Sequence, residues 1–183
     1  DKLLASMFQS VTMRTAGFNT VDLAAFSDGS ILLMICLMLI GGSTGSTAGG
    51  MKMTTAAVLV LSVISTFKHR KNIECFGRRL EEDIARAASC IFMMYLVLVL
   101  SATIIISAIE SLPVLSVLFE TVSAAATVGL TLGITPELSM VSKLILAALM
   151  IFGRAGSMTM LLAFSSDHVP VASKLPLEKI QIG

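Results

Sequence analysis

The longest hydrophobic run in the chain predicts one membrane-crossing helix. Residues 87–109 are 23 consecutive positions without a charge, bounded by Arg86 and Glu110. An α-helix rises about 1.5 Å per residue, so this run would be about 35 Å long, and the hydrocarbon core of a bilayer is about 30 Å thick. We therefore expect a single transmembrane helix here.

Two other hydrophobic stretches are interrupted by small polar residues. Residues 31–40 are apolar, residues 41–50 are rich in Gly, Ser and Thr, and apolar sequence then resumes to Phe67. One continuous helix from Gly29 to Phe67 would be about 58 Å long, so we expect a break between the two parts. Residues 144–152 likewise run into the glycine-containing segment 153–157, where we expect a second break. Lipid cannot hydrogen-bond the backbone of a broken helix, so such breaks indicate a transport path.

Composition supports a membrane protein. Hydrophobic residues make up 55% of the chain, the mean hydropathy is +0.91 and 14% of residues are charged, against about 25% in soluble domains. The net charge is only +1, which predicts no nucleic-acid partner. Cys36, Cys75 and Cys90 have no paired spacing, so we expect neither disulfides nor a zinc site, and instead small buried apolar side chains.

The basic residues predict which side of the plasma membrane each segment faces. Residues 68–86 would be cytoplasmic by the positive-inside rule. Residues before Ile31 and residues 110–143 would then lie outside, and the tail from Ser165 would lie inside. This assignment requires residues 112–142 to form a re-entrant segment that enters and leaves on the outer side. The six basic residues of the cytoplasmic loop are Lys68, Arg70, Lys71, Arg78, Arg79 and Arg86.

The chain contains an internal repeat of about 112 residues. The sequence around Gly17 resembles that around Gly129, and Gly153 lies the same 112 positions after Gly41. Upstream, residues 8–11 match residues 119–122 with a one-residue slip. Each unit is predicted to contain a short half-helix, a Thr-x-Gly turn and an outer-to-inner helix. Only the second unit includes its leading helix, and the first begins inside its half-helix.

A Thr-x-Gly turn after an apolar half-helix is typical of a cation filter. Backbone carbonyls can replace the hydration shell of a cation, and glycine tolerates the backbone angles that turn them toward one axis. The C-terminus of the half-helix adds partial negative charge. The alternative is that Gly17 and Gly129 are ordinary packing or turn glycines. The candidate ion ligands are the carbonyls of Thr15, Ala16, Gly17, Phe18, Thr127, Val128, Gly129 and Leu130.

With these motifs the chain resembles the C-terminal half of a Trk/Ktr/HKT superfamily potassium transporter, most of all the bacterial Ktr membrane subunit. The matching segments are 10–20, 41–50, 127–131 and 153–157. The resemblance implies an all-α membrane protein with four helix–pore-loop–helix repeats, of which this chain would carry about the last two. It should not form a closed pore alone. The implied organisation is an incomplete third repeat (1–71), a cytoplasmic loop (72–86), the fourth repeat (87–166) and a cytoplasmic tail (167–183).

The resemblance also implies an intramembrane gate below the filter. The Gly-rich segment does not fit a phosphate-binding P-loop, because Met51 and Lys52 follow it where Lys and Ser/Thr are required. A flexible linker is the other alternative. The implied gate loop consists of Gly41, Gly42, Ser43, Thr44, Gly45, Ser46, Thr47, Ala48, Gly49 and Gly50.

Two arginines are candidates for roles near the pore. Arg154 is the one charge in the last apolar stretch, and intramembrane charges are costly and usually functional. The resemblance implies that it faces the pore as an electrostatic barrier near the gate; a structural ion pair or a snorkelling side chain is the alternative. Arg14 directly precedes the first turn, and we expect it to brace the filter by pairing with Glu120.

The implied function is uptake of potassium without covalent chemistry, so the chain is not expected to be an enzyme. Potassium would be the substrate, and sodium stays open as a coupling or modulating ion. The implied partners are the membrane, a second copy in a homodimer and a cytoplasmic ring of nucleotide-binding regulatory subunits. Three alternatives remain: a sodium-selective or non-selective transporter, a non-conducting interaction subunit, and a solute carrier with broken helices.

Acidic residues on the predicted outer side could concentrate cations at the mouth of a pore. Ordinary solvated loop charges explain them equally well. These residues are Asp22, Asp28, Glu110 and Glu137.

Overall fold

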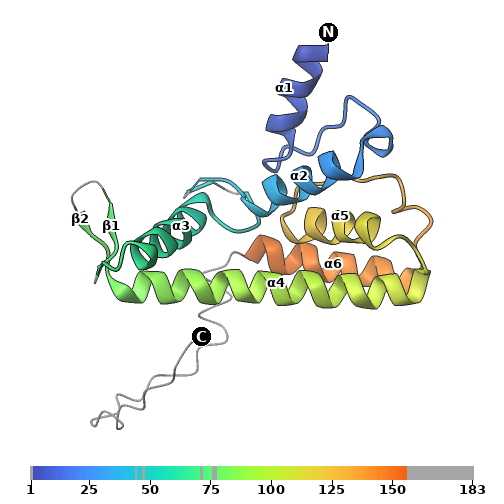
Figure 1. Ribbon diagram of the computed structural model, residues 1–183. Coiled ribbons are helices and arrows are strands. Elements are labelled where there is room, and N and C mark those ends of the chain that lie inside the picture. Colours follow the sequence, from blue (N-terminus) through green and yellow to red (C-terminus); the bar gives the residue numbers. More distant parts are fainter. Residues whose placement is uncertain (1, 44, 47, 71, 76–77, 156–183) are drawn as a thin grey trace.

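The computed structural model describes residues 2–43, 45–46, 48–70, 72–75 and 78–155, and within them the chain is mostly helical (Figure 1). A sheet of two antiparallel strands, each two residues long, is the one named sheet in this part of the chain. The elements, in order, are α1 (Lys2–Thr12), the 3-10 helix η1 (Leu23–Ala25), α2 (Asp28–Leu39), α3 (Met53–Phe67), β1 (Glu74–Cys75), β2 (Arg78–Arg79), α4 (Glu82–Glu110), α5 (Val114–Ala125) and α6 (Met140–Ala155).

Helix α4 confirms the helix predicted from the longest hydrophobic run and extends it at its N-terminal end. It has 29 residues, begins after Glu81 and ends where Ser111 adopts a left-handed conformation. Acidic residues in a first helical turn interact favourably with the helix dipole, which explains the earlier start. Over Asp83–Glu110 the helix is long and apolar enough to cross a membrane, and no other helix among the described residues meets that length.

The predicted break within 41–50 is confirmed. Helix α2 ends at Leu39 and α3 begins at Met53. The intervening loop is closed at its base, because the Gly41 amide donates to the Met51 carbonyl at 2.8 Å. The two ends of the loop therefore lie next to each other, between α2 and α3.

The second predicted break does not begin at Gly153. Helix α6 continues through Gly153 to Ala155. Gly153 is buried, and a Cβ there would overlap the carbonyl oxygen of Ala125 in α5. The glycine thus allows two helices to approach closely, and does not end one. Residues 156–157, which belong to the predicted break, lie outside the described residues.

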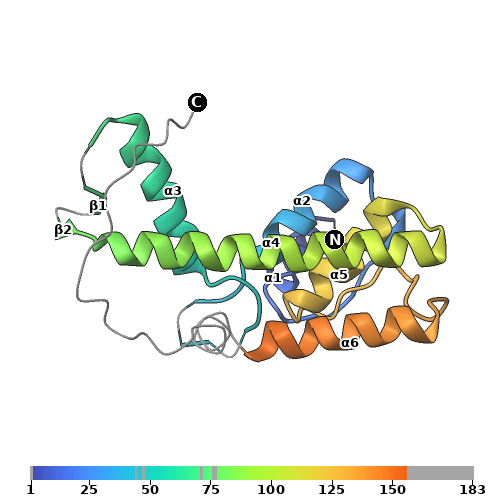
Figure 2. The same ribbon diagram turned by 90° about the horizontal axis from the view of Figure 1, so that it is seen from below.

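Helix α5 is the centre of the packing. It contacts α2 on one side and α4 and α6 on the other, and α4 and α6 run side by side (Figures 1 and 2). Its buried side chains include Val117, Phe119 and Val122, each at most 1% exposed. This short apolar helix is buried because the longer helices enclose it, and it holds the turn that follows it in place.

The expectation of buried cysteines is wrong for two of the three. Cys36 in α2 and Cys90 in α4 are exposed, and Cys75 is partly buried, all as free thiols. Cys36 and Cys90 lie on helix faces that no described element covers. In an apolar helix of a membrane protein, an outward face can be as apolar as the core, so residue type did not reveal burial here.

Candidate functional site

The two Thr-x-Gly turns have matching unusual backbone conformations. Thr15 and Gly17 have φ of 67° and 71°, and Thr127 and Gly129 have φ of 53° and 89°. Left-handed angles are rare for threonine, so their appearance at equivalent positions of both turns is informative. In both turns, two residues with positive φ flank one residue with ordinary negative φ.

The two turns lie against each other, although 112 positions separate them in the sequence. A Cβ added to Gly17 would overlap the carbonyl oxygen of Val128, and a Cβ added to Gly129 would lie 4.0 Å from the Cα of Gly17. The structure thus brings the two turns into contact at Gly17, Val128 and Gly129. The contact is made by backbone atoms, and this requires glycine at Gly17.

Each turn is braced by a hydroxyl group that the sequence analysis missed. The Thr12 hydroxyl donates to the Phe18 carbonyl at 2.7 Å and accepts from the Phe18 amide at 2.9 Å. The Ser123 hydroxyl donates to the Leu130 carbonyl at 2.6 Å. Thr12 and Ser123 are 111 positions apart, so the one-residue slip upstream of the turns was the signal that could have paired them.

The predicted pairing of Arg14 with Glu120 is wrong. The Arg14 guanidinium lies 3.7 Å from the sulfur of Met53, and the side chain is exposed. Glu120 is only 6% exposed and accepts hydrogen bonds from Thr131, Leu132 and Thr135, downstream of its own turn. The carboxylate faces back into its own repeat, where nearer donors satisfy it.

The Gly-rich loop lies directly against the second turn. A Cβ at Gly49 would overlap the Thr127 hydroxyl, and one at Gly50 would lie 3.2 Å from the Cβ of Ala126. The Thr127 hydroxyl is buried and has no hydrogen-bond partner among the described residues. Gly41–Ser43, Gly45, Ser46 and Ala48–Gly50 are described, whereas Thr44 and Thr47 lie outside the described residues.

A lysine that the sequence analysis passed over holds this loop together. The Lys52 ammonium donates to the carbonyls of Ser46 and Ala48, both at 2.8 Å. A lone lysine within otherwise apolar and small residues was the available signal. Arg154, the other cation of this region, is exposed on α6 directly after Gly153, the glycine that packs on α5.

Two of the acidic residues predicted to lie on the outer side have partners within the fold. Glu110 accepts from the Ser139 amide at 2.9 Å and from the Ser142 hydroxyl, so it joins the end of α4 to the beginning of α6. Asp22 accepts from the Ala24 amide at 3.0 Å and caps η1. The Glu110 contacts also bring both ends of the 112–142 segment to one end of the helix bundle.

Comparisons with known proteins show that the chain is similar to proteins of known name and to a solved structure. The chain is 37% identical to the potassium/sodium uptake protein NtpJ of Enterococcus hirae, covering 100% of this chain and 42% of that protein. It is 40% identical to the Ktr system potassium uptake protein B of Bacillus subtilis, covering 92% of this chain and 38% of that one. The crystal structure of the potassium transporter TrkH from Vibrio parahaemolyticus matches with a TM-score of 0.73 and 25% identity, over 88% of this chain and 36% of that chain.

This chain therefore spans about two fifths of the length of these relatives. The family model of TrkH, described as a cation transport protein, matches residues 1–170. The chain belongs to the TrkH family of cation transport proteins.

Proposed function

We propose that this chain is the part of a potassium uptake protein that carries two of its filter segments. The observation that carries the proposal is the contact between the two Thr-x-Gly turns with matched left-handed conformations. Such turns align backbone carbonyls, and carbonyls are the ligands that replace water around a dehydrated potassium ion. The carbonyls of Thr15–Phe18 and Thr127–Leu130 would coordinate the ion.

The half-helices support ion binding electrostatically. Helix α1 ends at Thr12 and α5 ends at Ala125, each within three residues of its turn. The C-terminus of a helix carries partial negative charge, which favours a cation beyond it. Both half-helices would thus stabilise an ion held at the turns without any charged side chain.

The loop of residues 41–50 would act as the gate, together with Arg154. The contact of Gly49 with Thr127 supports this role, because the loop would then lie next to the proposed filter, and small side chains would allow it to move past neighbouring backbone. Lys52 would hold the loop in its closed form through the carbonyls of Ser46 and Ala48. Arg154 would add a positive charge near the same path.

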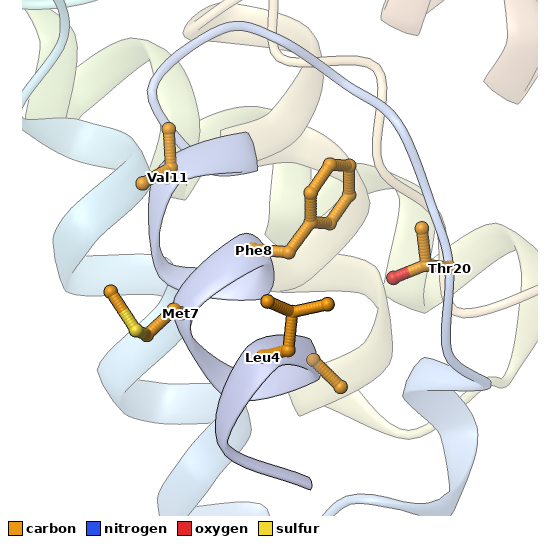
Figure 3. A pocket seen from close by; sticks show the side chains of 6 residues that line it. Leu4, Met7, Phe8, Val11 and Thr20 are labelled. Carbon is orange, nitrogen blue, oxygen red and sulfur yellow. The ribbon is translucent and has the colours of Figure 1, made fainter. Parts of the chain in front are cut away.

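One uncovered face of α1 supports a pore built from more repeats. Leu4, Met7, Phe8 and Val11 line a groove of about 600 Å³ on this face, and Leu4 and Phe8 point toward Thr20 (Figure 3). All four are exposed, Leu4 at 77%. The residues at the equivalent positions of the second repeat pack with α2, which is the inner helix of the first repeat. These equivalents are Leu115, Leu118, Phe119 and Val122.

The groove in Figure 3 would therefore be covered by the inner helix of a preceding repeat. A second groove of about 480 Å³ runs between α1 and α2 and includes Ser6, Ser10, Met34 and Leu37. Its equivalents form the cluster that α4 covers through Ala102 and Ile106. These equivalents are Val117, Thr121, Leu146 and Leu149. A leading helix like α4 would occupy the second groove.

The proposed organisation follows the repeat. Residues 1–71 would form an incomplete third repeat, 72–86 a cytoplasmic loop, 87–166 the fourth repeat and 167–183 a cytoplasmic tail. In the plasma membrane, the basic loop of residues 68–86 would face the cytoplasm. The full protein would form a homodimer and bind a ring of nucleotide-binding regulatory subunits on that side.

Transport of sodium is the second candidate function. It is favoured by the relative from Enterococcus hirae, whose name includes both potassium and sodium. Sodium would then be a coupling ion or a second substrate. The two candidates differ in whether sodium competes at the filter.

Rubidium uptake by the full-length protein tests the proposal. Rubidium is close to potassium in size and charge, so proteoliposomes with the purified protein should accumulate it, and external potassium should compete. Protein-free liposomes are the control. Competition by sodium as strong as that by potassium would favour the second candidate. No uptake, with and without the regulatory subunit, would contradict both.

A further inference from the structure

We infer that Glu120 is a positioning residue that fixes the outer end of the second filter segment, and thereby sets the preference for potassium over sodium. This inference rests on the proposed function. It concerns a side chain that would not touch the ion. Glu120 would act through the loop that follows the filter.

The carboxylate binds the loop at three points. One oxygen accepts from the Thr131 hydroxyl and from the Leu132 amide at 3.1 Å, and the other accepts from the Thr135 hydroxyl at 2.9 Å. The two threonine hydroxyls are 2.9 Å apart, and Thr131 also accepts from the Gly133 amide at 2.9 Å. The residues directly after the filter are thus held by one buried group.

Glu120 and Ser123 lie on the same face of α5. They are three positions apart, so their side chains lie one above the other on the helix. Ser123 holds the carbonyl of Leu130, the last residue of the filter segment, and Glu120 holds the residues that follow. Together they fix where that carbonyl points, and carbonyl position is what a filter uses to discriminate ions.

The charge of Glu120 is suited to this role. The side chain is 6% exposed, and neither ion pair among the described residues includes it. An ionised carboxylate accepts hydrogen bonds and has no proton to donate. Three donors converge on this one. Hydrogen bonds to a charged acceptor are stronger and shorter than neutral ones, so the loop is held firmly.

The first repeat lacks this brace. The position equivalent to Glu120 is Gln9, which is 3% exposed. Neither polar atom of its amide has a hydrogen-bond partner in the described part of the chain. Among the side chains that the structure describes, only that of Thr12 bonds the first turn. The two proposed filter segments would therefore differ in rigidity at their outer ends.

The test compares Glu120→Ala with the double variant Thr131→Val/Thr135→Val in the full-length protein. We expect both to keep rubidium uptake and to lower the preference for potassium over sodium about tenfold, equivalent to about 1.4 kcal/mol. Because both break the same brace, combining them should add little to either. Glu120→Gln should rescue part of the preference, since its amide can still bond both threonines.

Thr103→Val is the matched control. Thr103 bonds the hydroxyl of Thr121, the neighbour of Glu120 on α5, at 2.8 Å, but makes no bond to the loop. We expect this variant to lower thermal stability slightly and to leave ion preference unchanged.

Three outcomes would overturn the inference. The first is an unchanged ion preference in both Glu120→Ala and the threonine pair. The second is that Glu120→Gln loses as much ion preference as Glu120→Ala, while the double threonine variant keeps the normal preference. That result would mean that the charge of Glu120 sets the preference and the position of the loop does not. The third is an equal loss of preference in Thr103→Val. If Glu120→Ala does not fold, the threonine pair decides. Absence of uptake by the unaltered protein would instead count against the proposed function.

Discussion

Four residues in the left-handed region give the two Thr-x-Gly turns their shape. Two of them, Thr15 and Thr127, carry side chains, and a left-handed conformation costs such a residue about 1–2 kcal/mol. The hydroxyl braces from Thr12 and Ser123 supply local hydrogen bonds that help to offset this cost. The turns are therefore held by the half-helices before them.

Substitution of Gly129 separates backbone strain from ion selection. Its φ is 89° and the nearest atom to an added Cβ is 4.0 Å away, so Gly129→Ala would fit but would be strained by about 1 kcal/mol. We expect a slightly lower melting temperature and a loss of preference for potassium over sodium. Thermal unfolding and competitive rubidium uptake measure the two effects.

Gly45→Ala is the control for that experiment. Gly45 has φ of 90° and open space around it, but lies in the loop of residues 41–50, outside both turns and the loop that follows the second one. The variant should lose similar stability and keep its ion preference. If both variants kept the preference, the carbonyls near Gly129 would not select the ion.

The glycine turns could be predicted from the sequence because the Thr-x-Gly pattern occurs twice at one spacing. The bracing roles of three polar side chains could not be predicted, namely those of Thr12, Ser123 and Glu120. A polar residue in a short half-helix has the same sequence pattern whether or not a loop folds back onto it. The pairing of Arg14 with Glu120 failed for this reason. Opposite charges suggested a partner, but nearer hydroxyl and amide donors satisfy the carboxylate.

Among the elements, the loop between α2 and α3 is the proposed gate. It is closed at its base by the Gly41–Met51 hydrogen bond and packs through Gly49 on Thr127. Inside it, the charged group of Lys52 binds two carbonyls. Length alone predicted this break, since no bilayer accommodates a helix of about 58 Å.

The structural role of Gly153 could not be predicted from the sequence in the same way. A glycine within an apolar run can break a helix or allow close packing, and the choice depends on the neighbour. Here the carbonyl of Ala125 in α5 lies where a side chain would be, so the helix continues.

Removal of the Lys52 charge should loosen the gate. Lys52→Met keeps much of the side-chain length but frees both carbonyls, and each lost bond costs about 1 kcal/mol, a factor of about five in the closed population. We expect a higher basal rubidium flux in proteoliposomes without the regulatory subunit.

Lys143→Met is the matched control for Lys52→Met. Lys143 also donates to a backbone carbonyl, that of Pro136 at 3.0 Å, but far along the chain from the gate loop. It should leave the basal flux unchanged. A basal flux that is equal in both variants and in the unaltered protein would remove Lys52 from the gate.

At the scale of the whole molecule, the second repeat shows what the first one lacks. Helix α5 is enclosed by α2, α4 and α6, whereas α1 leaves two apolar grooves uncovered. The repeat itself was predictable from matched glycines. The grooves were not, because which side of a half-helix is covered depends on neighbours that only the folded second repeat reveals.

The central claim is that backbone carbonyls of both turns bind one potassium ion, and an ion-density measurement on the full-length protein tests it most directly. A crystal structure with rubidium in place of potassium would give an anomalous peak between residues 15–18 and 127–130, with the carbonyl oxygens as ligands. An ordered ion elsewhere in the membrane region, held by side chains and with none between the two turns, would contradict the account.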